Sequence, residues 1–208
     1  TYNSTIDLSN SRITGNYAPG NFGGAYFYAY DHSTIRVPNL YVYDNEAGDK
    51  YGGVGLDAAD GNDRIIATGA QVINNTARLD GGGGLAYASD GSRVDLTGSE
   101  FVSNTAGNYG GGVYVQSIVN GASLLLADTA FLTNTAGNDG GGVYFSHGPN
   151  YGSFLDLSGS RFISNTTGSD GGGFYLNILY YNDPTTVSLQ ADHMTFISNT
   201  ATGDGGGF

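Results

Sequence analysis

Acidic residues occupy one repeated position in the C-terminal half of the chain. Asp139, Asp170 and Asp204 each precede a glycine, and Asp80 has the equivalent position earlier in the sequence. If the repeats stack, neighbouring carboxylates lie about 5 Å apart, where like charges repel and a hard cation such as Ca²⁺ could bridge them. Asp before Gly is also a common turn-forming pair that needs no metal. The sequence leaves both interpretations open, and it predicts no other cofactor.

A second set of acidic residues shares another repeated position, which would matter if the chain cleaved polysaccharides. Lyases and glycoside hydrolases need two or three carboxylates that converge on one face. The residues that share this position are Asp7, Asp95 and Asp156. The repeats between them carry Arg36, Ile66 and Leu125 instead. We therefore expect these carboxylates to remain apart, and the sequence predicts no catalytic site.

Two other motifs that could support chemistry are incomplete. His32, His147 and His193 lie in separate repeats and lack the spacing of metal ligands. The glycine runs, such as residues 81–84, are not followed by the lysine of a phosphate-binding loop or surrounded by a strand-to-helix pattern.

Tyrosines recur at a position that is expected to face outward. Tyr114, Tyr144 and Tyr175 share it, and Tyr26 has it in the first repeat. A variable corner of the repeat adds three more: Tyr151, Tyr180 and Tyr181. Such aromatic rows can contact sugar rings or a neighbouring filament, and they also stabilise sheets through same-face pairs. The sequence therefore predicts a possible contact face without fixing its role.

These positions belong to a repeat of about 30 residues that runs through the whole chain. One asparagine marks each repeat, at spacings of 29, 30, 29, 30, 31 and 34 residues; these are Asn16, Asn45, Asn75, Asn104, Asn134, Asn165 and Asn199. In a stacked coil, a buried amide can donate to one neighbouring repeat and accept from the other. We therefore expect the seven side chains to form one continuous ladder. The residues that follow, often Thr and Ala, are expected to form a tight corner.

Apolar residues keep the same register as the asparagines. The positions ten, eight and three residues before each Asn are apolar in all seven repeats, and two glycines follow at seven and eight residues after it. The apolar residues alternate at period two, without helical periodicity. The glycine pairs would allow either positive φ or a close approach of two backbones. The sequence predicts an all-β fold, a right-handed single-stranded parallel β-helix of about seven rungs with three short strands each.

The amino-acid composition excludes or disfavours several classes of protein. The 208 residues include 36 Gly, 4 Pro and no Cys, without a Gly-X-Y period, so collagen and disulfide frameworks are excluded. The net charge of −12 disfavours nucleic acid as a partner. No apolar run approaches the length of a membrane span, so we expect no membrane insertion of this segment.

Three N-glycosylation sequons occur. Asn3 and Asn74 are the candidate acceptors, whereas Asn165 belongs to the asparagine row and is expected to be buried.

The pairing of Phe-x-x-Asn with a Gly-Gly-apolar element about seven residues later resembles the repeats of the chlamydial polymorphic outer membrane proteins and related bacterial surface adhesins. Residues 101–104, 131–134, 162–165 and 196–199 match Phe-x-x-Asn, and Ile or Val replaces Phe in the first three repeats. Gly-Gly-Ala occurs at residues 23–25, and the resemblance covers the whole chain. It implies a β-helical segment exposed at a cell surface.

We expect one continuous β-helix domain over residues 1–208, a segment of a longer solenoid or fibre. Open strand edges at its ends would pair with copies of the chain or with the rest of a longer chain. The predicted function is a non-catalytic extracellular or cell-surface structural protein, the shaft of a fibre or adhesin, stacking end to end into filaments, with glycans as further partners. The alternative is a β-helix polysaccharide lyase or glycoside hydrolase.

Overall fold

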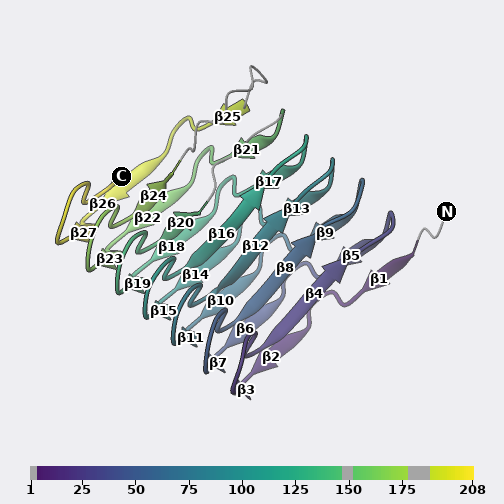
Figure 1. The fold of residues 1–208 in the computed structure, drawn as a ribbon, viewed down its shortest axis with the longest axis horizontal. Helices are drawn as coiled ribbons and strands as arrows, with labels where there is room; N and C mark the ends of the chain where they lie inside the picture. Colours follow the sequence, from purple (N-terminus) through teal and green to yellow (C-terminus); the bar gives the residue numbers. More distant parts are fainter. Residues whose placement is uncertain (1–3, 147–151, 178–187) are drawn as a thin grey trace.

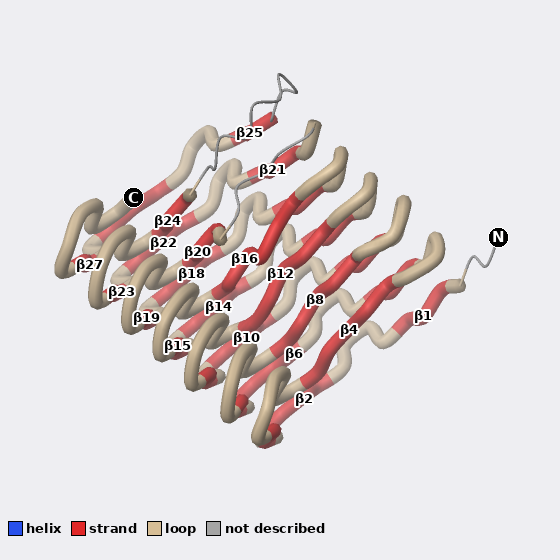
Figure 2. Tube along the Cα trace, viewed as in Figure 1, coloured by secondary structure: helices blue, strands red, loops and turns tan. Residues whose placement is uncertain are grey.

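The chain forms a β-solenoid. The computed structural model describes residues 4–146, 152–177 and 188–208, and within them the regular structure consists of 27 short strands and no helix. The rungs follow one another along the molecule, with the two termini at opposite ends of the stack (Figure 1). Short strands alternate with corners in every rung (Figure 2). The predicted all-β parallel β-helix is confirmed.

The strands form four parallel sheets, which we call A to D in the order in which the chain enters them. Sheet A contains β1 (Thr5–Asp7), β5 (Thr34–Arg36), β9 (Arg64–Ile66), β13 (Arg93–Asp95), β17 (Ser123–Leu125), β21 (Phe154–Asp156) and β25 (Ser188–Gln190). Sheet B contains β2 (Arg12–Thr14), β6 (Tyr41–Tyr43), β10 (Gln71–Ile73), β14 (Glu100–Val102), β18 (Ala130–Leu132), β22 (Arg161–Ile163) and β26 (Thr195–Ile197). Sheet C contains β3 (Tyr17–Ala18), β7 (Glu46–Ala47), β11 (Thr76–Ala77), β15 (Thr105–Ala106), β19 (Thr135–Ala136), β23 (Thr166–Thr167) and β27 (Thr200–Ala201). Sheet D contains β4 (Ala25–Ala29), β8 (Val54–Ala58), β12 (Gly84–Ala88), β16 (Val113–Ile118), β20 (Val143–Phe145) and β24 (Phe174–Leu176).

The number of strands per rung differs from the prediction. The sequence predicts three strands, whereas a full rung in the described chain has four. The additional strand is the two-residue segment of sheet C, which was expected to be only a corner. Because rungs stack directly, this segment still pairs from rung to rung, as in the bond from Thr105 N to Asn75 O at 2.9 Å. Backbone hydrogen bonding between rungs therefore continues through the corner.

The predicted apolar columns are confirmed. In sheet A, Leu124 pairs with Val94 on one side and with Leu155 on the other. In sheet B, Phe101, Phe131 and Phe162 stand one above another, fully buried, with ring centroids 5.2 and 4.9 Å apart. Burial of each such side chain contributes about 1.5 to 3 kcal/mol. The stacked columns thus form the core and fix the register of all outward-facing residues.

Of the two predicted roles of the paired glycines, positive φ and close backbone approach, the structure shows the second. A Cβ on Gly112 would lie 2.5 Å from the carbonyl oxygen of Gly142 and 3.1 Å from the ring of Phe131, which leaves no room for a side chain. The glycine pairs therefore allow close backbone approach. Positive φ occurs instead one residue before each pair, as at Gly110 (φ 66°).

One rung has an extra residue after its glycine pair. The register between β12 and β16 shifts after Ala86, which pairs with Val115, while Tyr87 pairs with Ser117. Gln116 is exposed and has no counterpart in β12. The insertion is absorbed as a bulge at the surface, so the inward columns stay aligned.

Candidate functional site

The seven asparagines form the predicted ladder. At each of the six steps, Nδ2 of one Asn donates to Oδ1 of the Asn in the next rung at 2.8–3.0 Å. The backbone N–H of the same Asn donates to the same Oδ1 at 2.9–3.0 Å. The second Nδ2 hydrogen goes to a carbonyl oxygen of the preceding rung, as from Asn134 to Phe101 O at 2.9 Å.

This bonding satisfies the polar atoms of the buried amides. Asn75, Asn104, Asn134 and Asn165 have no exposed surface, and each uses both Nδ2 hydrogens and accepts two bonds at Oδ1. A buried, neutral and fully bonded group has no capacity left for a ligand or a proton transfer. The ladder is therefore a structural element.

The outward tyrosine column lies on sheet D. Tyr114 pairs with Tyr144, and Tyr144 pairs with Tyr175. Their ring centroids are 5.5 and 5.2 Å apart, with interplanar angles of 23° and 7°. Tyr26 shares the column but is separated from Tyr114 by Gly55 and Leu85. Tyr151, Tyr180 and Tyr181 lie outside the described residues.

Three further aromatic residues, which the repeat pattern did not predict, join this face. Phe22 stacks on Tyr26 and on Tyr51 with centroids 4.3 and 5.0 Å apart, and Tyr51 lies 6.1 Å from Tyr114. Tyr109 stacks on Tyr144 at 4.6 Å. All three come from the corner between sheets C and D, so aromatic rings continue past the two rungs in which the strand position is not aromatic.

Two of these corner residues have an unusual backbone. Phe22 and Tyr51 have φ of 58° and 65°, in the column that is glycine in the later rungs, such as Gly81 and Gly110. The left-handed region costs a bulky side chain about 1–2 kcal/mol. The signal in the sequence was an aromatic residue six positions after the Asn, in place of glycine.

Two tyrosines of this face, Tyr144 and Tyr26, have a raised pKa and keep their protons at neutral pH. Burial, followed by the neighbouring Tyr114, Tyr109 and Tyr175 and by Asp139, raises the pKa of Tyr144 to about 12. Burial also raises the pKa of Tyr26, whose hydroxyl donates to Asp57 Oδ2. The Tyr144 hydroxyl can therefore donate as well as accept a hydrogen bond.

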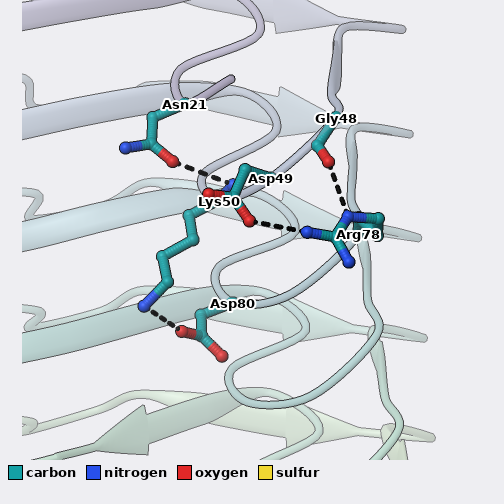
Figure 3. Close-up of polar contacts among 6 residues, drawn as sticks. All are labelled: Asn21, Gly48, Asp49, Lys50, Arg78 and Asp80. Carbon is teal, nitrogen blue, oxygen red and sulfur yellow. Dashed lines mark hydrogen bonds and ion pairs between the residues drawn. The ribbon is translucent and has the colours of Figure 1, made fainter. Parts of the chain in front are cut away.

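A column of polar residues borders the tyrosines at the same corner, five residues after each ladder asparagine. In the N-terminal rungs its charges are paired (Figure 3). Lys50 Nζ lies 2.8 Å from Asp80 Oδ2, and the Lys50 N–H donates to Asn21 Oδ1 at 3.2 Å. Beside it, the Arg78 guanidinium contacts Asp49 Oδ1 at 3.0 Å and donates to the Gly48 carbonyl at 2.7 Å.

In the C-terminal rungs the same column holds the calcium candidates Asp139, Asp170 and Asp204. Asp139 Oδ1 accepts the N–H of Asp170 at 3.1 Å, and Asp170 Oδ1 accepts the N–H of Asp204 at 2.7 Å. One oxygen of Asp139 and of Asp170 is therefore used to join rungs. Across the described ranges, no three His, Asp or Glu side chains are grouped so that they could hold a metal ion.

The other carboxylate set stays apart, as expected. In sheet A, Asp7 pairs with Arg36, and Ile66 pairs with Asp95. Leu125 separates Asp95 from Asp156.

Each of these three carboxylates has a local partner: Ser9 for Asp7, Arg93 and Thr97 for Asp95, and Ser158 for Asp156. Burial opposes ionisation of Asp95, but the bonds from Arg93 and Thr97 outweigh it and lower its pKa. A general acid would need a raised pKa.

The described histidines have acidic neighbours in the sequence. His32 Nδ1 lies 3.5 Å from Asp31, and His193 Nδ1 lies 3.1 Å from Asp192. His147 falls outside the described residues.

One sequon is accessible and another is not. Asn74 is exposed, and its Nδ2 donates to Asp44 Oδ1 at 3.0 Å. Asn165 is buried in the ladder, as expected. Asn3 lies outside the described residues.

Searches of protein-family models, curated proteins and solved structures find no match to this chain. The described residues form no helix long and apolar enough to cross a membrane.

Proposed function

We propose that this chain is a non-catalytic structural element, the shaft of a fibre or surface adhesin, exposed outside the cell. The observation that carries the proposal is the asparagine ladder, which runs through all seven rungs with hydrogen bonds of 2.8–3.0 Å. A solenoid in which each rung contacts only its neighbours forms an extended body that lengthens along one axis. Spacing and display are functions that such a body performs without chemistry.

The resemblance to bacterial surface adhesins supports the extracellular location. Asn74 would carry an N-linked glycan if the source organism glycosylates its surface proteins. End-to-end association with further rungs fits the same role, because pairing of strand edges extends a solenoid through the same kind of hydrogen bonds that join its own rungs.

One observation favours the alternative of a polysaccharide lyase or glycoside hydrolase. Asp170 and Asp204 both line a cavity of about 240 Å³, together with Phe174, Tyr175 and Phe208. Most glycosidases use a pair of carboxylates that flank the scissile bond. Against this alternative, Asp170 Oδ1 already accepts the Asp204 N–H.

Two measurements test the proposal. Immunogold electron microscopy of the source cells is expected to place the chain at the surface, within rod-shaped projections. Incubation of the purified chain with neutral and acidic polysaccharides is expected to release no reducing or unsaturated ends. An intracellular location would overturn the shaft, and cleavage that is lost in Asp170→Asn would establish the enzyme.

A further inference from the structure

The C-terminal half of sheet D carries a compact pattern of rings and carboxylates, which we call the tyrosine stripe. It consists of Tyr109, Tyr114, Tyr144 and Tyr175, with Asp139 and Asp170 beside them. Asp139 precedes Tyr144 by five residues, and Asp170 precedes Tyr175 by five. Two consecutive rungs therefore present the same pair, one phenol ring and one carboxylate.

The rings form a partly exposed apolar strip along the stack of rungs. All four are half-buried, and the ring centroid of Tyr144 lies 4.6, 5.5 and 5.2 Å from those of Tyr109, Tyr114 and Tyr175. At such separations parallel rings are offset, so each covers its neighbour only in part. The strip therefore keeps part of each ring accessible from outside.

The carboxylates of the stripe have unused acceptor capacity. The inter-rung bonds engage Oδ1 of Asp139 and Asp170, and no described residue donates to Oδ2 of either. Residues 94–208 contain nine acidic residues and one basic residue, Arg161, which lies in β22 on sheet B. The stripe thus offers acceptors to hydroxyl groups and repels polyanions.

We propose that the tyrosine stripe binds a neutral, extended β-linked polysaccharide strand that lies along the solenoid axis, with one sugar over each rung. Apolar and aromatic surface beside a few polar groups is typical of small-molecule sites, and the acidic surroundings disfavour an anionic ligand. Pyranose rings have apolar faces and equatorial hydroxyls, which match the phenol rings and the free Oδ2 atoms. In an extended β-1,4 chain the advance per sugar is close to the distance between rungs, about 4.8 Å.

This binding site goes beyond the proposed shaft and does not depend on it. A rod could display the stripe whether or not it forms filaments. If glycan binding fails, the surface location and the absence of cleavage would still support the shaft.

The test is calorimetric titration of the whole chain with soluble hexasaccharides. Cellohexaose and chitohexaose present the extended β-1,4 geometry, whereas maltohexaose has the same size but coils. We expect the β-linked sugars to bind at least about tenfold more tightly than maltohexaose, and Tyr144→Ala to weaken that binding about tenfold. Tyr144→Phe, which keeps the ring, is expected to retain most of the affinity.

Tyr43→Ala provides a matched control. Tyr43 is 39% exposed and stacks on Tyr41 at 6.0 Å, but it lies on sheet B. Its removal is expected to leave affinity within about twofold, and urea unfolding of each variant shows whether the fold is intact. Equal binding of α- and β-linked hexasaccharides, absence of binding, or an equal loss in Tyr43→Ala would each overturn the proposal. Binding of polylysine alone, abolished by salt and unchanged in Tyr144→Ala, would instead identify a purely electrostatic patch.

Discussion

At the scale of single residues, the stability of this protein depends on groups that are satisfied only by their equivalents in adjacent rungs. Asn134 is fully buried, and it supplies the acceptor for Asn104 and donates to both Asn165 and the Phe101 carbonyl. Removing one member therefore leaves polar atoms without partners in two other rungs. Such a loss costs more than the hydrogen bonds of one side chain.

We predict that Asn134→Ala destabilises the protein by about 3 to 6 kcal/mol, since several buried groups lose their partners at about 1–3 kcal/mol each. Urea unfolding followed by circular dichroism measures the change. Asn138→Ala is the matched control, because Asn138 is exposed and its backbone N–H still bonds to Asn108 O. If the two variants lost similar amounts of unfolding free energy, the ladder would contribute no more to stability than an exposed asparagine.

At the scale of elements, the sheets stack closely because specific positions are small. The backbone of Gly112 approaches that of Gly142 so closely that a methyl group would lie 2.5 Å from a carbonyl oxygen. The obstacle is backbone of the next rung rather than a mobile side chain. The strands of sheet D therefore enter each rung along a path that only glycine permits.

Gly112→Ala is expected to destabilise the fold by about 1 to 3 kcal/mol or more through overpacking. Gly20→Ala serves as control, because a Cβ there meets no atom within 4 Å and the backbone is not left-handed. That change is expected to be neutral or to stabilise by about 0.5 kcal/mol. The thermal unfolding midpoints of both variants and of the wild type test this prediction. A midpoint of Gly112→Ala equal to that of the wild type would contradict it.

The tyrosine stripe makes the free energy of unfolding depend on pH in the alkaline range. An unfolded tyrosine loses its proton near pH 10, whereas Tyr144 in the folded chain holds it to about 12. Between these values the unfolded chain binds fewer protons, so the stabilisation is complete below pH 10 and declines as pH rises through about 12. Urea midpoints across this range should fall, and less steeply in Tyr144→Phe. Identical slopes in the two proteins would contradict the assignment.

The columns could be predicted from sequence because every rung repeats them. Asn104 and Asn134 identify the ladder, and Phe101 and Phe131 identify the core, since equivalent residues must stack. The strand of sheet C was missed because its two residues carry no alternating pattern.

Phe22, Tyr51 and Tyr109 were missed because each departs from its column. A column is recognised because equivalent positions of the repeats carry similar residues. A residue that differs from its counterparts therefore gives no periodic signal. Likewise, the use of one oxygen of Asp139 by the Asp170 N–H depends on corner geometry, which spacing alone does not contain.

At the scale of the whole molecule, acidic and basic residues are distributed unevenly along the chain. The chain carries −12, and the described ion pairs that involve Lys or Arg lie in the first four rungs. Beyond Arg93, one basic residue accompanies nine acidic ones. Mutual repulsion therefore opposes folding most strongly in the C-terminal half.

Screening this repulsion should raise stability by about 1 kcal/mol between low and physiological ionic strength. NaCl and CaCl₂ at matched ionic strength are expected to shift the urea midpoint equally, because the described part of the chain has no cluster of metal ligands. A larger shift with CaCl₂, reversed by EDTA, would instead establish that the aspartate column binds calcium.

The hydrogen bonds of the asparagine row all run in one sense. In each step the amide nitrogen gives its hydrogen to the oxygen of the following rung, from Asn16 onward to Asn199. A rung supplied by any other molecule could continue the row only head to tail, since an inverted copy would bring oxygen against oxygen at the Asn16 end or N–H against N–H at the Asn199 end. A fibre built on this row would be polar, with two chemically distinct tips and growth that differs between them.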